Sequence, residues 1–220
     1  MKNAVVFDLD GTLINTLDSL LISVNTTLDR LNLGSITENN CRDFIGSGAK
    51  ELVKKSVVET QGNCSDELLE KTMIVYKEVF KEFCTYNVVP YEGILNLLKD
   101  LKAKGFKLAV LSNKPHEGTV KIVEQYFGKD YFDFIKGQTA DIPRKPHPSG
   151  LIYTMQQIGS TNAETLYVGD SEVDMETGLA ASVDTVGVTW GFRERDVIAK
   201  MQPSKIVDNT KELLDYIYSL

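Results

Sequence analysis

Short apolar segments alternate along this chain with longer segments whose apolar residues recur at helical spacing. The short segments are rich in Val, Leu and Ile, as buried strands are, and they cover residues 4–7, 107–111, 134–135, 165–168 and 185–188. Helix-period segments ending near Gly105, Gly128 and Gly159 separate the later ones, and residues 211–220 form a last one. Because helices that link parallel strands cover both faces of their sheet, the alternation predicts an α/β fold with a parallel sheet.

The alternation is interrupted after the first apolar segment. Up to residue 87 the chain shows only helical periodicity, with apolar faces at 17–31 and 49–57 and a third beginning after Ser65, a favourable N-cap residue. We therefore expect a helical domain at 16–87, inserted into an α/β core made of 1–15 and 88–220.

Charge and composition limit the classes of function. The 24 Lys and Arg against 31 Asp and Glu give a net charge of −7, which argues against a general binder of nucleic acid or of membrane surfaces. An anionic substrate would need local positive charge or a metal ion. The 2 histidines and the scattered Cys41, Cys64 and Cys84 offer no His-rich or Cys-rich metal site, so carboxylates must carry the chemistry.

No apolar run approaches the roughly 18 residues of a membrane span. The first apolar segment is also too short, and too soon followed by Asp8, for a signal peptide. We expect a cytoplasmic protein, a monomer or homodimer, without membrane or nucleic-acid partners.

Polar residues follow several of the predicted strands. Asp8, Asp10 and Gly11 follow the first, Ser112 the second, and Asp170 and Asp174 the fourth, while Lys145 lies in a proline-rich loop. Ligands of open α/β sheets bind beyond the carboxyl ends of the strands, so these side chains are expected to converge.

Such crowded carboxylates need a compensating charge. Two like charges ~4 Å apart repel by about 4 kcal/mol at an effective dielectric constant of ~20, and one lysine cannot neutralise four aspartates. Hard oxygen ligands favour Mg²⁺. We expect Asp8 and Asp170 to bind it directly, Asp10 through its main-chain carbonyl, and Asp174 through water or by orienting Lys145.

The chemical roles follow from these positions. Asp8 at the strand end suits a nucleophile that forms an aspartyl phosphate, and Asp10 suits the acid that protonates the leaving oxygen and later deprotonates water. Gly11 permits a tight turn beside the phosphate, whose oxygens Ser112 and Lys145 can hold.

Four motifs resemble those of the haloacid dehalogenase-like hydrolases, in the family's order and over almost the whole chain. They cover residues 8–13 (DLDGTL), 111–114 (LSNK), 144–148 (RKPHP) and 168–174 (VGDSEVD). The resemblance implies a Rossmann-like core with sheet order 5-4-1-2-3, a helical cap inserted after the first strand, and Mg²⁺-dependent phosphoryl transfer with Asp8 as the nucleophile. Within the motifs, Gly11, Thr12 and Asn113 are expected to contact the substrate. The second aspartate, Asp10, favours a phosphatase over a dehalogenase, because halide leaves without a proton.

Further segments, 43–48 (DFIGSG), 145–148 and 187–192 (GVTWGF), resemble phosphoglycolate phosphatases. The substrate of those enzymes is a small phosphorylated metabolite that carries a carboxylate. The resemblance implies that Arg42 and the turn Gly46, Ser47, Gly48 contact this carboxylate, although Arg42 fits an exposed helix charge equally well. Pyrophosphatases, sugar-phosphate phosphatases and β-phosphoglucomutase-like enzymes carry similar caps and remain alternatives. Many relatives also have Asp-Ser where this chain has Asn15-Thr16 at the cap hinge.

Two readings come from other classes of protein. A phospho-accepting receiver module also gathers acids, a hydroxyl and a lysine around Mg²⁺, but the inserted helical segment and Asp10 favour a turnover enzyme. A dinucleotide-binding domain has no support, since no GxGxxG follows a predicted strand.

Overall fold

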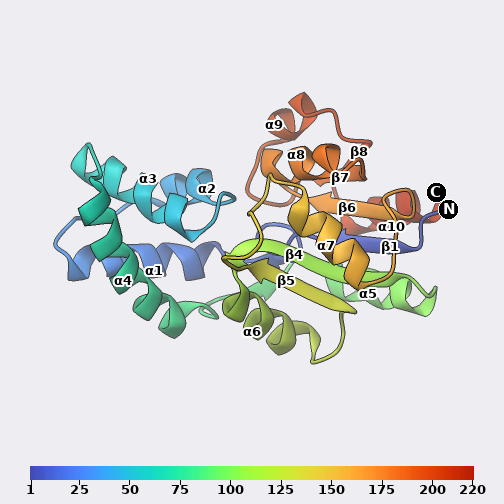
Figure 1. Cartoon of the computed structure of the whole chain (residues 1–220), viewed down its shortest axis with the longest axis horizontal. Helices are drawn as coiled ribbons and strands as arrows, with labels where there is room; N and C mark the ends of the chain where they lie inside the picture. Colours follow the sequence, from blue (N-terminus) through green and yellow to red (C-terminus); the bar gives the residue numbers. More distant parts are fainter. The chain divides into compact units, whose positions relative to one another are not determined.

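The computed structural model describes all residues, 1–220, and divides the chain into two compact units (Figure 1). The core unit consists of Met1–Asn15 and Pro90–Leu220, and the helical unit is Thr16–Val89. The chain thus returns to the core unit at Pro90, where the sequence analysis placed the return at residue 88.

A six-stranded sheet forms the centre of the core unit, in the order β5-β4-β1-β6-β7-β8, and every adjacent pair in it is parallel. Its strands are β1 (Ala4–Phe7), β4 (Lys107–Pro115), β5 (Phe134–Gln138), β6 (Thr165–Gly169), β7 (Asp184–Val188) and β8 (Lys205–Val207). The first five contain the apolar segments described above. The edge strand β8 was not expected, because its three residues include an exposed lysine and form no apolar run.

Helices pack on both faces of this sheet, as the alternating pattern predicts (Figure 1). They are α5 (Ile94–Ala103), α6 (His116–Phe127), α7 (Ser149–Gln157), α8 (Glu172–Ala180), α9 (Arg195–Lys200) and α10 (Thr210–Tyr218). Ala4 and Val6 share one buried cluster with Leu151 and Met155 of α7. Val5 and Phe7 point to the opposite face and are equally buried, so β1 has no polar side chain on either face.

Strand β4 is longer and less regular than the predicted segment 107–111. It continues to Pro115, and its pairing with β5 shifts register between Leu111 and Pro115. Such an irregularity redirects the side chains that follow it. Ser112, Asn113 and Lys114 lie within the shifted stretch.

The helical unit contains α1 (Leu17–Arg30), α2 (Glu38–Phe44), α3 (Ala49–Gln61) and α4 (Asp66–Phe83). The expected N-cap of α4 is confirmed, since the Ser65 hydroxyl accepts a hydrogen bond from the Leu68 N–H at 3.2 Å. Helix α2 was not expected as a separate helix; a capping box at Thr37 and Asn40 starts it. Two short strands, β2 (Ile14–Asn15) and β3 (Val89–Pro90), pair where the chain leaves the core unit and where it returns.

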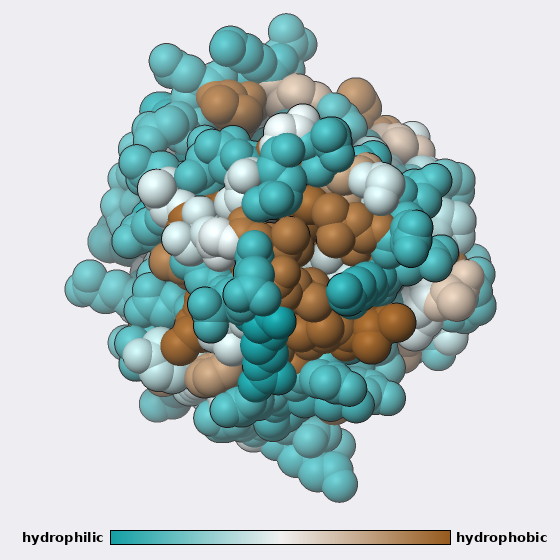
Figure 2. Space-filling model, turned by 90° about the vertical axis from the view of Figure 1, so that its left-hand side faces the viewer, coloured by the Kyte–Doolittle hydropathy of each residue, from teal (hydrophilic) through white to brown (hydrophobic).

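The helical unit also exposes apolar surface. A groove of about 610 Å³ is lined by the apolar side chains Leu69, Met73 and Ile74 and by charged side chains of both signs, Lys50, Asp66, Glu70 and Lys77. Ile74 is 63% exposed. Figure 2 shows a face of the molecule on which apolar side chains gather inside a hydrophilic surround.

Candidate active site

The carboxyl ends of β1, β4 and β6 bring the predicted site residues of the core unit to one edge of the sheet. Phe7 is in register with Val110 on one side and with Val168 on the other. Asp8 follows Phe7 directly, and its N–H donates to the Val168 carbonyl at 2.8 Å. The central strand therefore delivers the Asp8 carboxylate between the residues that follow its two neighbours.

Asp8, Asp170 and Asp174 form a buried cluster in which one carboxylate oxygen of each lies within 4.8 Å of the others. Asp170 is the first residue after β6, and Asp174 lies one helical turn further on, in α8. The Asp10 side chain is not a member of this cluster, as expected for a residue whose side chain stays outside the metal-binding set.

Lys145 is the counter-charge of this cluster. Its ammonium donates to Asp8 Oδ1 and to Asp174 Oδ1, both at 2.7 Å, and to the Tyr167 hydroxyl at 3.0 Å. The side chain is only 3% exposed. The contact between Asp174 and Lys145 agrees with one of the two tasks considered for Asp174, that of orienting Lys145.

Burial and mutual repulsion shift the pKa values of these groups. Burial, together with the Asp174 carboxylate, raises the pKa of Asp8 well above its usual value and that of Asp170 to about 7. Burial alone would lower the pKa of Lys145, but the Asp174 and Asp8 carboxylates outweigh it and hold that pKa well above the usual value. One ammonium therefore does not balance three buried carboxylates.

The cluster has the chemistry of a site for a divalent cation. Its donors are carboxylate oxygens without nitrogen or sulfur, the donor set that Mg²⁺ prefers, and the raised pKa values of Asp8 and Asp170 show that further positive charge would stabilise the ionised forms. The residues present therefore fit the ion expected from the sequence.

The Asp170 carboxylate is held by its surroundings on several sides. Thr12 Oγ1 donates to Asp170 Oδ1 at 3.3 Å, and the Phe192 N–H donates to Oδ2 at 2.7 Å. A Cβ at Gly11 or at Gly191 would overlap the Asp170 side chain. Gly11 also has a φ of +89°, so both conformation and space require glycine there. Thr12, predicted to contact substrate, thus also positions a predicted metal ligand.

Asn113 supports the loop that carries Lys145. Its Nδ2 donates to the Lys145 carbonyl at 3.0 Å, and its Oδ1 accepts from the Lys145 N–H at 2.8 Å. Asn113, predicted to contact the substrate, thus has both ends of its side-chain amide hydrogen-bonded to the Lys145 backbone. Asn113 lies in the stretch of β4 where the pairing with β5 shifts register.

Three segments of the chain contribute residues to the site that the sequence does not indicate. Tyr167 lies within the apolar segment 165–168, yet its hydroxyl donates to Asp174 Oδ1 at 2.8 Å. Gly191 and the Phe192 N–H belong to the segment 187–192, which was noted only for its family resemblance. The third, Lys114, follows Ser112 and Asn113 in motif order, but the sequence did not show which way it points.

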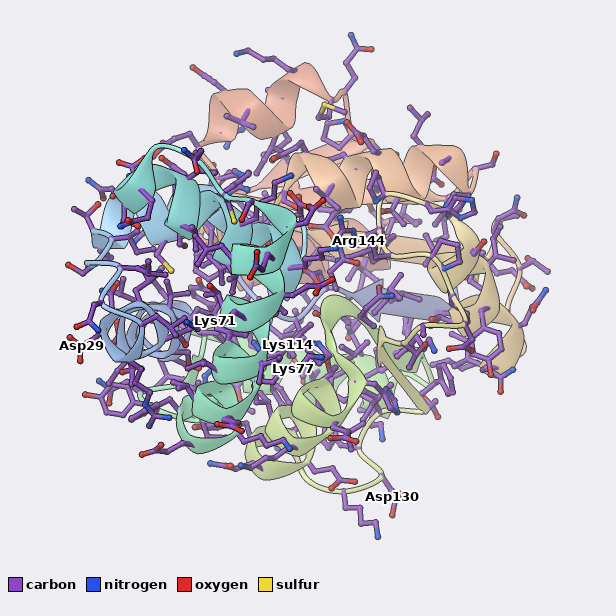
Figure 3. All side chains as sticks on the ribbon, turned by 60° about the vertical axis from the view of Figure 1, so that its left-hand side comes forward. Asp29, Lys71, Lys77, Lys114, Asp130 and Arg144 are labelled. Carbon is purple, nitrogen blue, oxygen red and sulfur yellow. The ribbon has the colours of Figure 1, made fainter.

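Lys114 forms an ion pair with the predicted general acid. Its Nζ lies 2.8 Å from Asp10 Oδ1, and its side chain is 3% exposed. Figure 3 shows Lys114, which comes from the end of β4. The neighbouring Ser112 is also buried, and its Oγ accepts a hydrogen bond from the Lys114 N–H at 3.1 Å.

The remaining predicted residues belong to the helical unit. Arg42, on α2, forms a 3.2 Å ion pair with Glu38 and its side chain is 39% exposed. Gly46 and Gly48 have positive φ values of 114° and 86°, and Gly48 is the N-cap of α3, with Ser47 between them.

Comparison with known proteins agrees with this geometry. The model of the haloacid dehalogenase-like hydrolase family matches residues 5–188. The chain belongs to this family. A phosphoglycolate phosphatase of Pseudomonas putida is 31% identical over 97% of the chain and 79% of its own length, and one of Psychrobacter arcticus is 29% identical over 98% and 96%. The solved structure of a predicted phosphoglycolate phosphatase from Haemophilus somnus, 28% identical, superposes with a TM-score of 0.91 over 98% of each chain.

Within the haloacid dehalogenase-like hydrolases, this chain resembles the phosphoglycolate phosphatases, and its enzyme class is that of a phosphoric monoester hydrolase. None of its helices is both long and apolar enough to cross a membrane.

Proposed function

We propose that this hydrolase is a Mg²⁺-dependent phosphatase that cleaves a small phosphate monoester through an aspartyl phosphate on Asp8, with 2-phosphoglycolate as the leading substrate. The observation that carries the proposal is the division of the carboxylates. Asp8 lies in the buried cluster with Asp170, Asp174 and Lys145, whereas the Asp10 side chain lies outside it.

The proposed first step uses Asp8 and Asp10. A carboxylate oxygen of Asp8 attacks phosphorus, the bond from phosphorus to the ester oxygen breaks, and Asp10 gives that oxygen a proton. In the second step Asp10 takes a proton from water, the water oxygen attacks phosphorus, and the bond to Asp8 breaks. Phosphate leaves, and both aspartates return to their starting states.

Positive charge supports both steps. The Lys145 ammonium, which bonds Asp8 and Asp174, and the Ser112 hydroxyl are proposed to hold the non-bridging phosphate oxygens. When bound, Mg²⁺ would supply charge neutralisation of the phosphate, held by Asp8, Asp170 and the Asp10 main-chain carbonyl with Asp174 in support. Thr12 and Gly11 keep the Asp170 carboxylate in place.

The substrate assignment rests on the relatives named as phosphoglycolate phosphatases. We propose that the helical unit acts as a cap, in which Arg42 and the turn Gly46, Ser47, Gly48 meet the carboxylate of the substrate. Inorganic pyrophosphate, sugar phosphates and a β-phosphoglucomutase-like transfer are the alternatives. We also propose that the enzyme works in the cytoplasm as a monomer or homodimer.

A direct test measures phosphate release with Mg²⁺ from 2-phosphoglycolate, pyrophosphate, hexose phosphates and nucleotides. A kcat/KM preference for 2-phosphoglycolate supports the assignment, and broad weak release would leave phosphatase chemistry with another substrate. The matched variant Asp8→Asn preserves shape but removes the nucleophile, and activity near wild type would contradict the covalent scheme. A single phosphorylation without turnover would favour a receiver-like switch.

A further inference from the structure

The mechanism above gives no task to one buried ammonium at the site, that of Lys114. Buried lysines are rare in folded proteins unless they are paired. Lys114 is 3% exposed and lies 2.8 Å from Asp10 Oδ1, while the Asp10 side chain is 13% exposed. The lysine of this pair is therefore shielded from solvent, whereas the aspartate is partly accessible to it.

Two hydrogen bonds hold the backbone of Lys114. Its N–H donates to Ser112 Oγ, and its carbonyl accepts from Thr119 Oγ1 at 3.2 Å. A Cβ at Gly137 of β5 would lie 2.8 Å from the same carbonyl, so glycine there allows the close approach of the two strands. The irregular end of β4 is therefore held by specific contacts, and it directs the Lys114 side chain toward Asp10.

The site thus contains two separate groupings of opposite charge. Lys145 joins Asp8 and Asp174 in the buried cluster, and Lys114 joins Asp10, whose carboxylate stays outside that cluster. Asp8 and Asp10 are two residues apart, so without a partner of its own the Asp10 carboxylate would be drawn toward any cation bound by the cluster. An Asp10 side chain displaced in this way could not deliver a proton to the leaving group.

We infer that Lys114 is a positioning residue that holds the Asp10 carboxylate in its leaving-group position and apart from the metal-binding carboxylates. The inference rests on the proposed function, because it concerns how the acid of that reaction is placed. It distinguishes Lys114 from Lys145, which acts on the nucleophile and the phosphate.

The test compares two substrates with different needs for an acid. The p-nitrophenolate of p-nitrophenyl phosphate leaves readily without a proton, whereas the alkoxide oxygen that leaves from 2-phosphoglycolate needs one. Removing the ammonium in Lys114→Met should lower kcat at least about tenfold more for 2-phosphoglycolate than for p-nitrophenyl phosphate, within the ~10²–10⁴-fold range of general acid catalysis. Lys114→Arg keeps the charge and should recover part of this difference.

Two controls separate positioning from stability. Lys99→Met, an exposed lysine of α5, should leave the ratio of the two activities unchanged. Thermal unfolding shows whether Lys114→Met folds, and Lys114→Gln, which keeps a hydrogen-bond donor, replaces it if not. A variant that lost both activities equally would indicate a merely structural ion pair and overturn the inference.

A double-mutant comparison locates the effect at Asp10. If Lys114 works through Asp10, adding Lys114→Met to Asp10→Asn should not increase the difference between the two substrates further. Independent, multiplicative losses would overturn the inference. So would a rise in KM for 2-phosphoglycolate at unchanged kcat, which would mark Lys114 as a direct substrate contact. Absence of wild-type activity on either ester would instead refute the proposed function itself.

Discussion

Replacement of Lys145 by methionine gives the sharpest test of the electrostatics of the site. Methionine fills similar space but leaves Asp8 and Asp174 without the ammonium that now lies 2.7 Å from each. Breaking a buried ion pair by removing one partner costs about 3–5 kcal/mol. We expect a loss of stability of this order in Lys145→Met at pH 8 without divalent metal.

The pH dependence of that loss has a definite sign. Burial already raises the pKa of Asp8 well above its usual value and that of Asp170 to about 7. Removing Lys145 raises both pKa values further, so the variant folds best with these carboxyls protonated. The loss should therefore be largest at pH 8 and should shrink as the pH falls through about 7, where Asp170 takes up a proton.

Urea unfolding followed by tryptophan fluorescence measures this effect in the right part of the molecule. The single tryptophan, Trp190, lies in the core unit and donates a hydrogen bond to the Thr12 carbonyl at 3.0 Å, so its emission reports unfolding there. Saturating Mg²⁺ should return part of the lost stability, because the cation replaces the missing charge. An equal loss at pH 8 and pH 5.5, or none at pH 8, would refute the reasoning.

Three further predictions concern the metal and the substrate. Stabilisation by Mg²⁺, measured as a thermal shift, should be larger at pH 8 than at pH 5.5, because metal competes with the proton on Asp170, whose pKa is about 7; equal shifts would contradict this. Gly191→Ala places a methyl group against Asp170 and should raise the Mg²⁺ concentration for half-maximal activity at least about tenfold, as loss of a supporting contact does. Arg42→Ala should raise KM for 2-phosphoglycolate but not for p-nitrophenyl phosphate, and an unchanged ratio would assign Arg42 to its ion pair with Glu38.

The parts of the fold that the sequence predicts are those with a local signal. Strand β1 is recognisable because all four of its residues are apolar and buried on both faces, and Ser65 is recognisable because N-cap chemistry involves only residues three apart. Strand β8 has no such signal, since it is a three-residue edge strand that exists only by pairing with β7.

The same distinction holds for the site. Asp8, Asp170 and Lys145 are predictable, because a parallel sheet brings its strand ends together whatever their distance along the chain. The partners of these residues are not. Whether Tyr167 faces core or site depends on its place in the pleat, and the direction of Lys114 depends on a register shift that only pairing with β5 creates.

The insertion of the helical unit has a consequence for how such a protein can change over generations. The chain leaves the core unit at Asn15 and returns at Pro90, and the strands at these two points pair with each other. All residues proposed for bond making and breaking lie on the core side of this junction. Under the proposed function, mutation, lengthening or replacement of the segment between the paired strands would therefore change the substrate contacts proposed for Arg42 and residues 46–48 and leave Asp8 and Asp10 unchanged.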